Sequence, residues 1–165
     1  MLRLARFLLL FSLIAYGIWP YYHVFRLDAA LGEDDLDTAS LDQVIDVQSI
    51  RDNYKRRLSA GLGGVLPVEP SADQPVIRGL AQGIDQVGGA AIDRYVDLAW
   101  VREALRQATR DVTQQSPPFL ISAIRFAFFE SYDSFLIRLG ELGEDATHIR
   151  MRLEGTHWRV TDIIR

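Results

Sequence analysis

The chain of 165 residues contains no cysteine, which excludes disulfide scaffolds, thiolate metal sites, a catalytic thiol and a lipidated cysteine. Its 12 glycines and 6 prolines are too few for a collagen-like or low-complexity chain. Aromatic residues make up 10% of the sequence and the mean hydropathy is +0.03, so a fully disordered chain is excluded as well. These absences leave a globular protein with room for one domain.

Charged residues are missing from one stretch near the N-terminus, between Arg6 and Arg26. As a helix, the 19 residues from Phe7 to Phe25 would be about 28 Å long. That length is close to the hydrocarbon core of a bilayer, which is ~30 Å thick. The sequence therefore predicts that residues 7–25 contact and cross a membrane.

The charges on either side of this stretch predict its orientation. Arg3 and Arg6 precede it, whereas all 22 acidic residues of the chain follow it. The positive-inside bias then places the N-terminus in the cytoplasm. We predict a signal anchor over residues 1–26 and a single α+β domain over residues 27–165.

Two other interpretations of the apolar stretch stay open. It is also compatible with a cleaved signal peptide that has Leu8 to Ala15 as its apolar region and Ala15-Tyr16-Gly17 as a weak cleavage site. A buried helix of a soluble protein would show a similar run. With either a signal anchor or a cleaved signal peptide the domain is exported, and the two interpretations differ only in whether the mature protein keeps the apolar helix.

Helical periodicity dominates the first part of the domain. The pattern of the apolar stretch continues to Gly32, and further helices are expected over 36–45, 47–62, 76–87, 91–95 and 98–112. Asp97 is positioned to cap the last of these helices. Glycines and prolines over about 61–75 predict a long loop.

From about Leu120 onward, apolar residues recur at every second position, and this alternation predicts three or four antiparallel strands. Turns are expected at Tyr132-Asp133, over 140–145 and at Gly155-Thr156. A two-residue loop at Gly155-Thr156 would place Leu153 opposite Trp158 and Met151 opposite Val160. The apolar face would hold Ile124, Phe126, Phe128, Phe135, Ile137, Leu139, Ile149, Met151, Leu153, Trp158 and Val160. The predicted fold is α+β, with a transmembrane helix, a helical half, and a sheet whose helices cover one face.

Several short motifs together resemble a known family. They are Pro20-Tyr21-Tyr22 in the apolar stretch, Leu27-Asp28-x-x-Leu31, Val44-x-Asp46 running into Ser49-Ile50-Arg51, and Trp158-x-Val160. This pattern is similar to a bacterial envelope family catalogued only as a domain of unknown function. The resemblance implies a single-pass inner-membrane protein with a periplasmic domain, cystatin-like or related to the nuclear-transport-factor-like fold. It implies no activity.

Motifs that carry chemistry are missing from the sequence. The three histidines lack the spacing of a zinc site, the serines lack a nucleophile elbow, and Gly61-x-Gly63-Gly64 lacks the lysine of a phosphate loop. The acidic run over 33–37 lacks calcium-loop spacing and is interpreted as a solvated turn. We therefore expect no catalytic residue, no metal and no cofactor, and the acidic balance argues against nucleic acid as a partner.

One cluster of charged side chains is a candidate binding site. The strand pattern places four arginines on the outer face of the sheet: Arg138, Arg150, Arg152 and Arg159. Guanidinium groups suit carboxylate and phosphate, so an acidic protein surface or anionic lipid headgroups are the expected partners. The simpler interpretation is a solvated face whose arginines pair with local acids such as Glu154 or Glu141.

The function predicted from these patterns is a membrane-anchored, non-catalytic interaction or binding module. The alternative is a small-molecule binding protein or proton-transfer enzyme with a cone-shaped pocket under the sheet. Such a pocket would leave Phe126, Phe128, Tyr132 and Trp158 partly unfilled. Its acid and base would be a carboxylate beside a tyrosine, as in Tyr95 with Asp97 or Tyr132 with Asp133.

Overall fold

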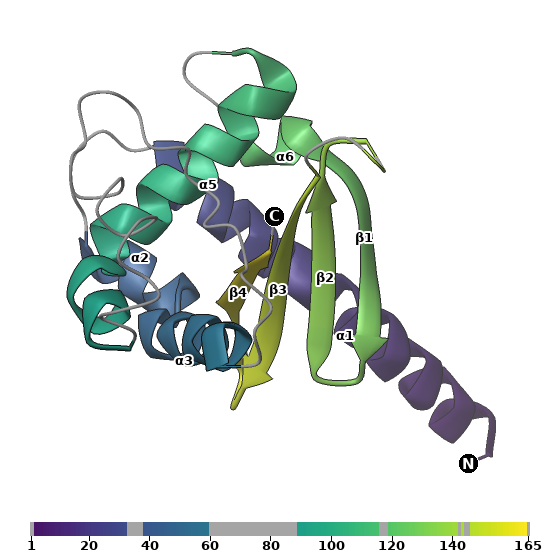
Figure 1. Cartoon of the computed structure of the whole chain (residues 1–165). Coiled ribbons are helices and arrows are strands. Elements are labelled where there is room, and N and C mark those ends of the chain that lie inside the picture. The colour runs from purple at the N-terminus through teal and green to yellow at the C-terminus, as the bar shows by residue number, and fades with distance from the viewer. Residues whose placement is uncertain are drawn as a thin grey trace.

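The computed structural model confirms the α+β class (Figure 1). It describes residues 2–32, 38–59, 89–115, 119–141, 143 and 146–164. The labelled helices are α1 (Leu2–Gly32), α2 (Thr38–Val44), α3 (Val47–Ser59), α5 (Leu98–Thr113) and α6 (Leu120–Ala123). The strands are β1 (Ile124–Ser131), β2 (Ser134–Leu139), β3 (Thr147–Glu154) and β4 (His157–Ile164).

The helices follow the predicted periodicity closely. α1 is one continuous helix of 31 residues that ends at Gly32, as expected. The side chain of Asp97 accepts a hydrogen bond from the Trp100 backbone N–H at 2.7 Å, which confirms the cap of α5. A helical stretch over 89–95 precedes that cap. The predicted loop at 61–75, the helix at 76–87 and the acidic run at 33–37 lie outside the described residues.

The four strands form an antiparallel meander in the order β1-β2-β3-β4. The last hairpin has the predicted register, with Leu153 opposite Trp158 and Met151 opposite Val160. Gly155 has a φ of +62°, a left-handed conformation that suits glycine in a tight hairpin turn. The sheet therefore has one apolar face and one face that carries the arginines.

The start of the sheet differs from the prediction. Residues 120–123 form the short helix α6, and a register shift follows, because Ile124 pairs with Leu139 and Phe126 with Arg138. The extra residue turns Phe126 and Phe128 to the outer face, where they are 52% and 40% exposed. The expectation that these two side chains line the apolar face was wrong.

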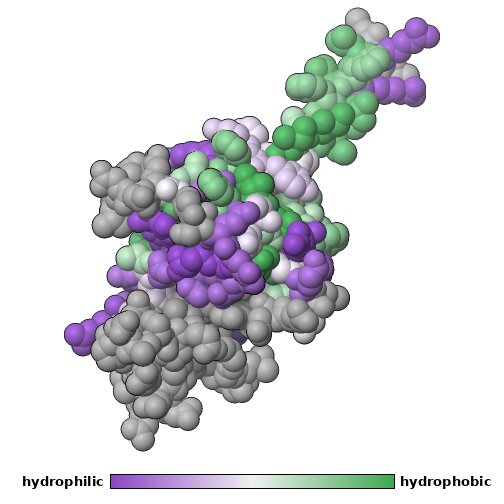
Figure 2. Space-filling model, turned by 90° about the horizontal axis from the view of Figure 1, so that it is seen from above, coloured by the Kyte–Doolittle hydropathy of each residue, from purple (hydrophilic) through white to green (hydrophobic). Residues whose placement is uncertain are grey.

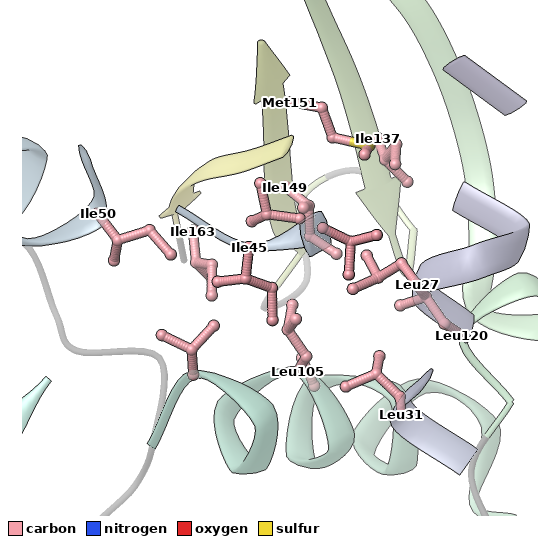
Figure 3. Packing of buried hydrophobic residues seen from close by; sticks show 14 of the residues in the cluster. Leu27, Leu31, Ile45, Ile50, Leu105, Leu120, Ile137, Ile149, Met151 and Ile163 are labelled. Atoms are coloured by element: carbon pink, nitrogen blue, oxygen red, sulfur yellow. The ribbon is translucent and has the colours of Figure 1, made fainter. Parts of the chain in front are cut away.

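The core lies between the apolar face of the sheet and the helices. In Figure 3, Leu27 of α1, Leu105 of α5 and Ile149 of β3 point toward one another. α3 lies along β4, where Tyr54 Oη donates to the Ile163 carbonyl oxygen at 3.0 Å. Burial of this phenol raises the pKa of Tyr54. The edge of β4 is further covered by a bridge between Ile45 and Val160.

Candidate functional site

The first feature that bears on function is the division of α1 into two halves. Its second half is part of the core, with Pro20, His23, Val24, Leu27, Ala30 and Leu31 all buried. The residues from Arg3 to Ile18 are exposed, apart from the half-buried Gly17. Figure 2 shows this first half as an apolar rod that projects from the rest of the molecule. α1 is long and apolar enough to cross a membrane or to serve as a signal sequence.

Besides the core packing, ring contacts and a hydrogen bond hold α1 against the sheet. The Tyr16 ring stacks on Phe129 at 5.7 Å between ring centroids, and Tyr21 packs edge-on against Phe135 at 5.1 Å. The Trp19 indole N–H donates to the Thr156 carbonyl oxygen at 2.9 Å. The ring of His23 lies 6.0 Å from that of His157. Tyr16 and Trp19 thus mark the sheet end that carries the β1–β2 and β3–β4 turns. The sequence pattern did not indicate that these aromatic residues meet the sheet, because their partners follow more than a hundred residues later.

The division of the chain into an anchor over 1–26 and a domain over 27–165 stays a prediction. α1 passes through this boundary without a break, and Val24 on the N-terminal side of it is 4% exposed. The helix that leaves the domain is therefore the same rigid element that completes the core.

The second feature is the outer face of the sheet, where the structure places the four predicted arginines. Arg150 donates two hydrogen bonds to Glu130, at 2.6 and 3.0 Å. Arg152 donates to Asp133 at 2.9 Å. Arg159 donates to Glu154 at 3.0 Å and also to the backbone carbonyl oxygens of Asp42 and Ile45. Three of the four guanidinium groups therefore already have an internal acidic partner.

These pairs explain how like charges coexist on neighbouring strands. Arg152 and Arg159 lie directly opposite each other, as predicted, which is unfavourable unless each is compensated. The hydrogen bonds from Arg150 hold the pKa of Glu130 below its usual range. A hydrogen bond from Ser131, followed by one from Arg152, lowers the pKa of Asp133 in the same way. Both acids are thus ionised at neutral pH and offset the arginines.

A buried acid completes this network. Asp162 is 2% exposed and accepts hydrogen bonds from Arg57 at 2.7 Å and from Arg150 at 3.5 Å. Its other oxygen, Oδ1, is buried without a hydrogen-bond partner. Sequence reasoning missed Asp162, although an aspartate between Val160 and Ile163 in a strand is a signal for a buried charge with a partner.

Arg138 is the exception among the four arginines. Its Nε is buried without a hydrogen-bond partner, and no acid pairs with it among the described residues. The guanidinium lies over the Phe126 ring, 5.6 Å from the ring centroid, and Phe126 in turn contacts Phe128 at 5.3 Å. Arg138, Phe126 and Phe128 form an exposed apolar and cationic patch, which we call the Phe-Arg patch.

The residues of the predicted cone-shaped pocket do not share one cavity. Trp158 is fully buried in the core, where its ring contacts Phe129 and Phe135. Phe126 and Phe128 face outward, and Tyr132 is 79% exposed in the β1–β2 turn. A polar cavity of about 290 Å³ lies instead between α3 and the arginine face. Its lining includes Asn53, Ser131, Asp133, Arg150 and Arg152.

The carboxylates of the predicted proton-transfer pairs already have other partners. Asp97 accepts the hydrogen bond that caps α5. Asp133 accepts hydrogen bonds from Ser131 Oγ at 2.6 Å and from Arg152. Within the part of the chain that the structure describes, no three side chains of the metal-binding types lie together.

The first part of the chain matches a known protein family. A family model with the description "Protein of unknown function (DUF2939)" matches residues 9–114, which is more than half of the chain. The match runs from α1 through α5 and stops before the sheet. No curated protein and no solved structure matches the chain.

Proposed function

We propose a tethering role at a membrane for this chain, which belongs to the DUF2939 family of proteins of unknown function. In this proposal it is a single-pass protein of the bacterial inner membrane, with a cytoplasmic N-terminus and a periplasmic domain. The domain is a non-catalytic binding module held at the membrane surface. The observation that carries the proposal is that α1 is exposed and apolar in its first half and buries one side of its second half in the core.

A helix divided in this way fixes the domain more tightly than a flexible linker would. Residues such as Leu8, Phe11 and Leu13 are 62 to 72% exposed, and the described residues do not cover them. In water such a surface is costly, because each exposed apolar side chain forgoes about 1.5 to 3 kcal/mol of burial. In the membrane, lipid chains would surround these apolar side chains in place of water. The domain then cannot rotate freely relative to the membrane, because α1 belongs to both.

The Phe-Arg patch is the surface proposed to meet the partner. The other three arginines have acidic partners, so the outer face as a whole is a weak attractant for anions. Arg138 lacks an acidic partner in the described part of the chain and is flanked by two exposed aromatic rings. A protein surface with an apolar side chain next to a carboxylate would complement it.

Lysine substitutions in the exposed first half of α1 test the tether. Leu10 and Ile14 are 55% and 51% exposed, so their replacement does not disturb the core. The double variant Leu10→Lys, Ile14→Lys adds about 2.5 to 3.5 kcal/mol of insertion cost per lysine. We expect the double variant to be lost from alkali-washed membranes, whereas Leu10→Ile with Ile14→Leu is retained. A reporter enzyme that is active only after export, fused after Arg165, gives the orientation.

Two results would contradict the tether. One is equal membrane retention of the lysine variant and its control. The other is recovery of the wild-type protein in the soluble periplasmic fraction with a new N-terminus near Ile18, which is the outcome expected of a cleaved signal peptide.

A photoreactive amino acid at position 128 tests the partner surface. Phe128 is exposed on the patch, and Phe119 is similarly exposed but lies outside it, so position 119 is the matched control. We expect a crosslinked protein at position 128 that is lost when Arg138→Gln is added. Crosslinking that is the same at both positions, or that is unaffected by Arg138→Gln, would remove the patch as the binding surface.

The polar cavity favours a second candidate function, binding of a small anionic ligand. Arg152 is 57% exposed there and is paired with Asp133, which an anion would have to displace. Inorganic phosphate is the simplest probe. A rise in melting temperature with phosphate that is absent in Arg152→Gln would support this role, and no rise in either protein would dismiss it.

A further inference from the structure

We propose that the sheet itself contacts lipid, and that the end with the β1–β2 and β3–β4 turns rests in the headgroup layer. Trp19 and Tyr22 of α1 and Tyr132 of the β1–β2 turn would then form one aromatic belt, contributed by two parts of the fold. This inference rests on the proposed membrane insertion of α1 and adds a second contact between the protein and the membrane.

The exposed first half of α1 is too short to cross a bilayer by itself. The first described contact between α1 and the sheet is the stack of Tyr16 on Phe129. From Arg6 to Tyr16 the helix rises only about 15 Å, at ~1.5 Å per residue. The hydrocarbon core is ~30 Å thick, so α1 would cross only half of it before it meets the domain. The remaining thickness has to be made up at both ends.

Arginine side chains make up part of the difference on the cytoplasmic side. Arg3 and Arg6 precede the apolar run, and long cationic side chains extend toward the headgroups while their stems stay in the apolar region. From Arg3 to Trp19 the helix rises about 24 Å, and the reach of the arginine side chain brings this near the required span. The far boundary of the hydrocarbon then falls at Trp19, a point where α1 already contacts the sheet.

The side chains at this level are of the type found at membrane interfaces. Trp19, Tyr22 and Tyr132 are 45%, 56% and 79% exposed, and each combines an aromatic body with a polar group. The indole N–H of Trp19 already has the Thr156 carbonyl oxygen as its acceptor, so this donor is satisfied at the boundary. Figure 1 shows α1 leaving the fold behind β1 and β2, on the side where their connecting turn lies.

The charges at this end of the sheet are paired, which lowers the cost of bringing them near lipid. Arg152 is bonded to Asp133 beside one turn, and Arg159 to Glu154 beside the other. An unpaired charge carried into the hydrocarbon just below the headgroups would be much more expensive than an ion pair. The internal pairing of the arginine face thus suits a surface that lies at the edge of the hydrocarbon.

Single-cysteine spin labelling of the full chain measures this contact directly, because the protein has no native cysteine. Labels are placed at Thr156 and Tyr132 on the proposed lipid-facing end. The control is Glu141, which is exposed and follows β2 at the opposite end of the sheet. A fourth label at Leu10 reports on the membrane-spanning half itself. The chain is reconstituted in vesicles of phosphatidylethanolamine and phosphatidylglycerol.

The readout is the collision rate of each label with oxygen, which concentrates in lipid, relative to a water-soluble nickel chelate. We expect this ratio to be several-fold higher at positions 156 and 132 than at position 141, and highest at position 10. Equal ratios at 156, 132 and 141, with position 10 still in the hydrocarbon, would overturn this inference and leave the tether intact. A label at position 10 that meets the chelate freely would refute the proposed function itself.

Discussion

Two neighbouring phenylalanines in β1 offer a sharp test of how the sheet is built. The alternating pattern of the sequence would place Phe128 in the core and Phe129 outside, whereas the register shift after Ile124 reverses them. The perturbation is therefore a matched pair, Phe129→Ala and Phe128→Ala. Both remove the same side chain from adjacent positions in one strand.

The structure predicts different costs for the two variants. The Phe129 ring contacts Tyr16, Phe135 and Trp158, at 5.7, 5.1 and 5.8 Å between centroids. Truncation of a buried phenylalanine to alanine costs about 3 to 5 kcal/mol, and Phe129 is only partly covered, so we expect a loss of about 3 kcal/mol. Phe128 is 40% exposed and contacts only the ring of Phe126 among the described aromatic pairs. Its removal should cost about 1 kcal/mol.

The assay is urea or thermal unfolding of the full chain in detergent, followed by circular dichroism. The difference of about 2 kcal/mol corresponds to a melting temperature that is about 4 to 8 °C lower for Phe129→Ala than for Phe128→Ala. The reverse order would mean that the register shift is absent and that the simple alternation of the sequence is correct. Equal values would place both rings at the same degree of burial and would also refute the reasoning.

Three further predictions concern the core, a helix cap and the ion pairs. Trp158→Ala should lower the free energy of unfolding by about 3 to 5 kcal/mol, because the ring is fully buried, and an unchanged melting temperature would contradict the register of the last hairpin. Asp97→Ala should cost about 1 kcal/mol through loss of the cap of α5, and Asp97→Asn should restore most of it. Arg150 lowers the pKa of Glu130 in the folded chain, so the stabilisation from this pair is present above the ordinary carboxyl pKa of ~4.3 and is lost as the pH falls through the lower, folded value. The midpoint of urea unfolding should therefore fall on acidification, and fall less in Glu130→Gln; an identical fall in both proteins would assign the effect to other acids.

The parts of the fold that follow from local sequence were predictable. The four-residue recurrence of Ile50 and Tyr54, the position of Asp97 before Leu98, and the Gly155-Thr156 turn each specify their element within a few residues. In each case the signal and the structure that it determines lie close together in the chain. The α+β class follows from the change of period near residue 120.

The parts that depend on distant contacts were not predictable. A register shift adds one residue without changing the alternating pattern, so nothing in the sequence of β1 shows that Phe126 faces outward. Glu154 was named as a partner of the arginines, but the pairing of Glu130 with Arg150 requires β1 and β3 to be brought together by β2. The docking of α1 on the sheet is the largest omission. An apolar helix of this kind has no marked polar side. Its periodicity therefore did not show that one side of its second half packs against the sheet.

The central claim is that α1 belongs to the membrane and to the core of the domain at the same time. The most direct measurement is the distance between two nitroxide labels, one at Phe25 on the exposed side of α1 and one at Glu141 beyond the sheet. The full chain would carry both labels in lipid nanodiscs, and the distance would be measured by pulsed electron paramagnetic resonance. We expect one narrow distribution centred on the distance in the structure. A broad distribution, or a second population at longer distance, would show that α1 detaches from the sheet in the membrane and would contradict the claim.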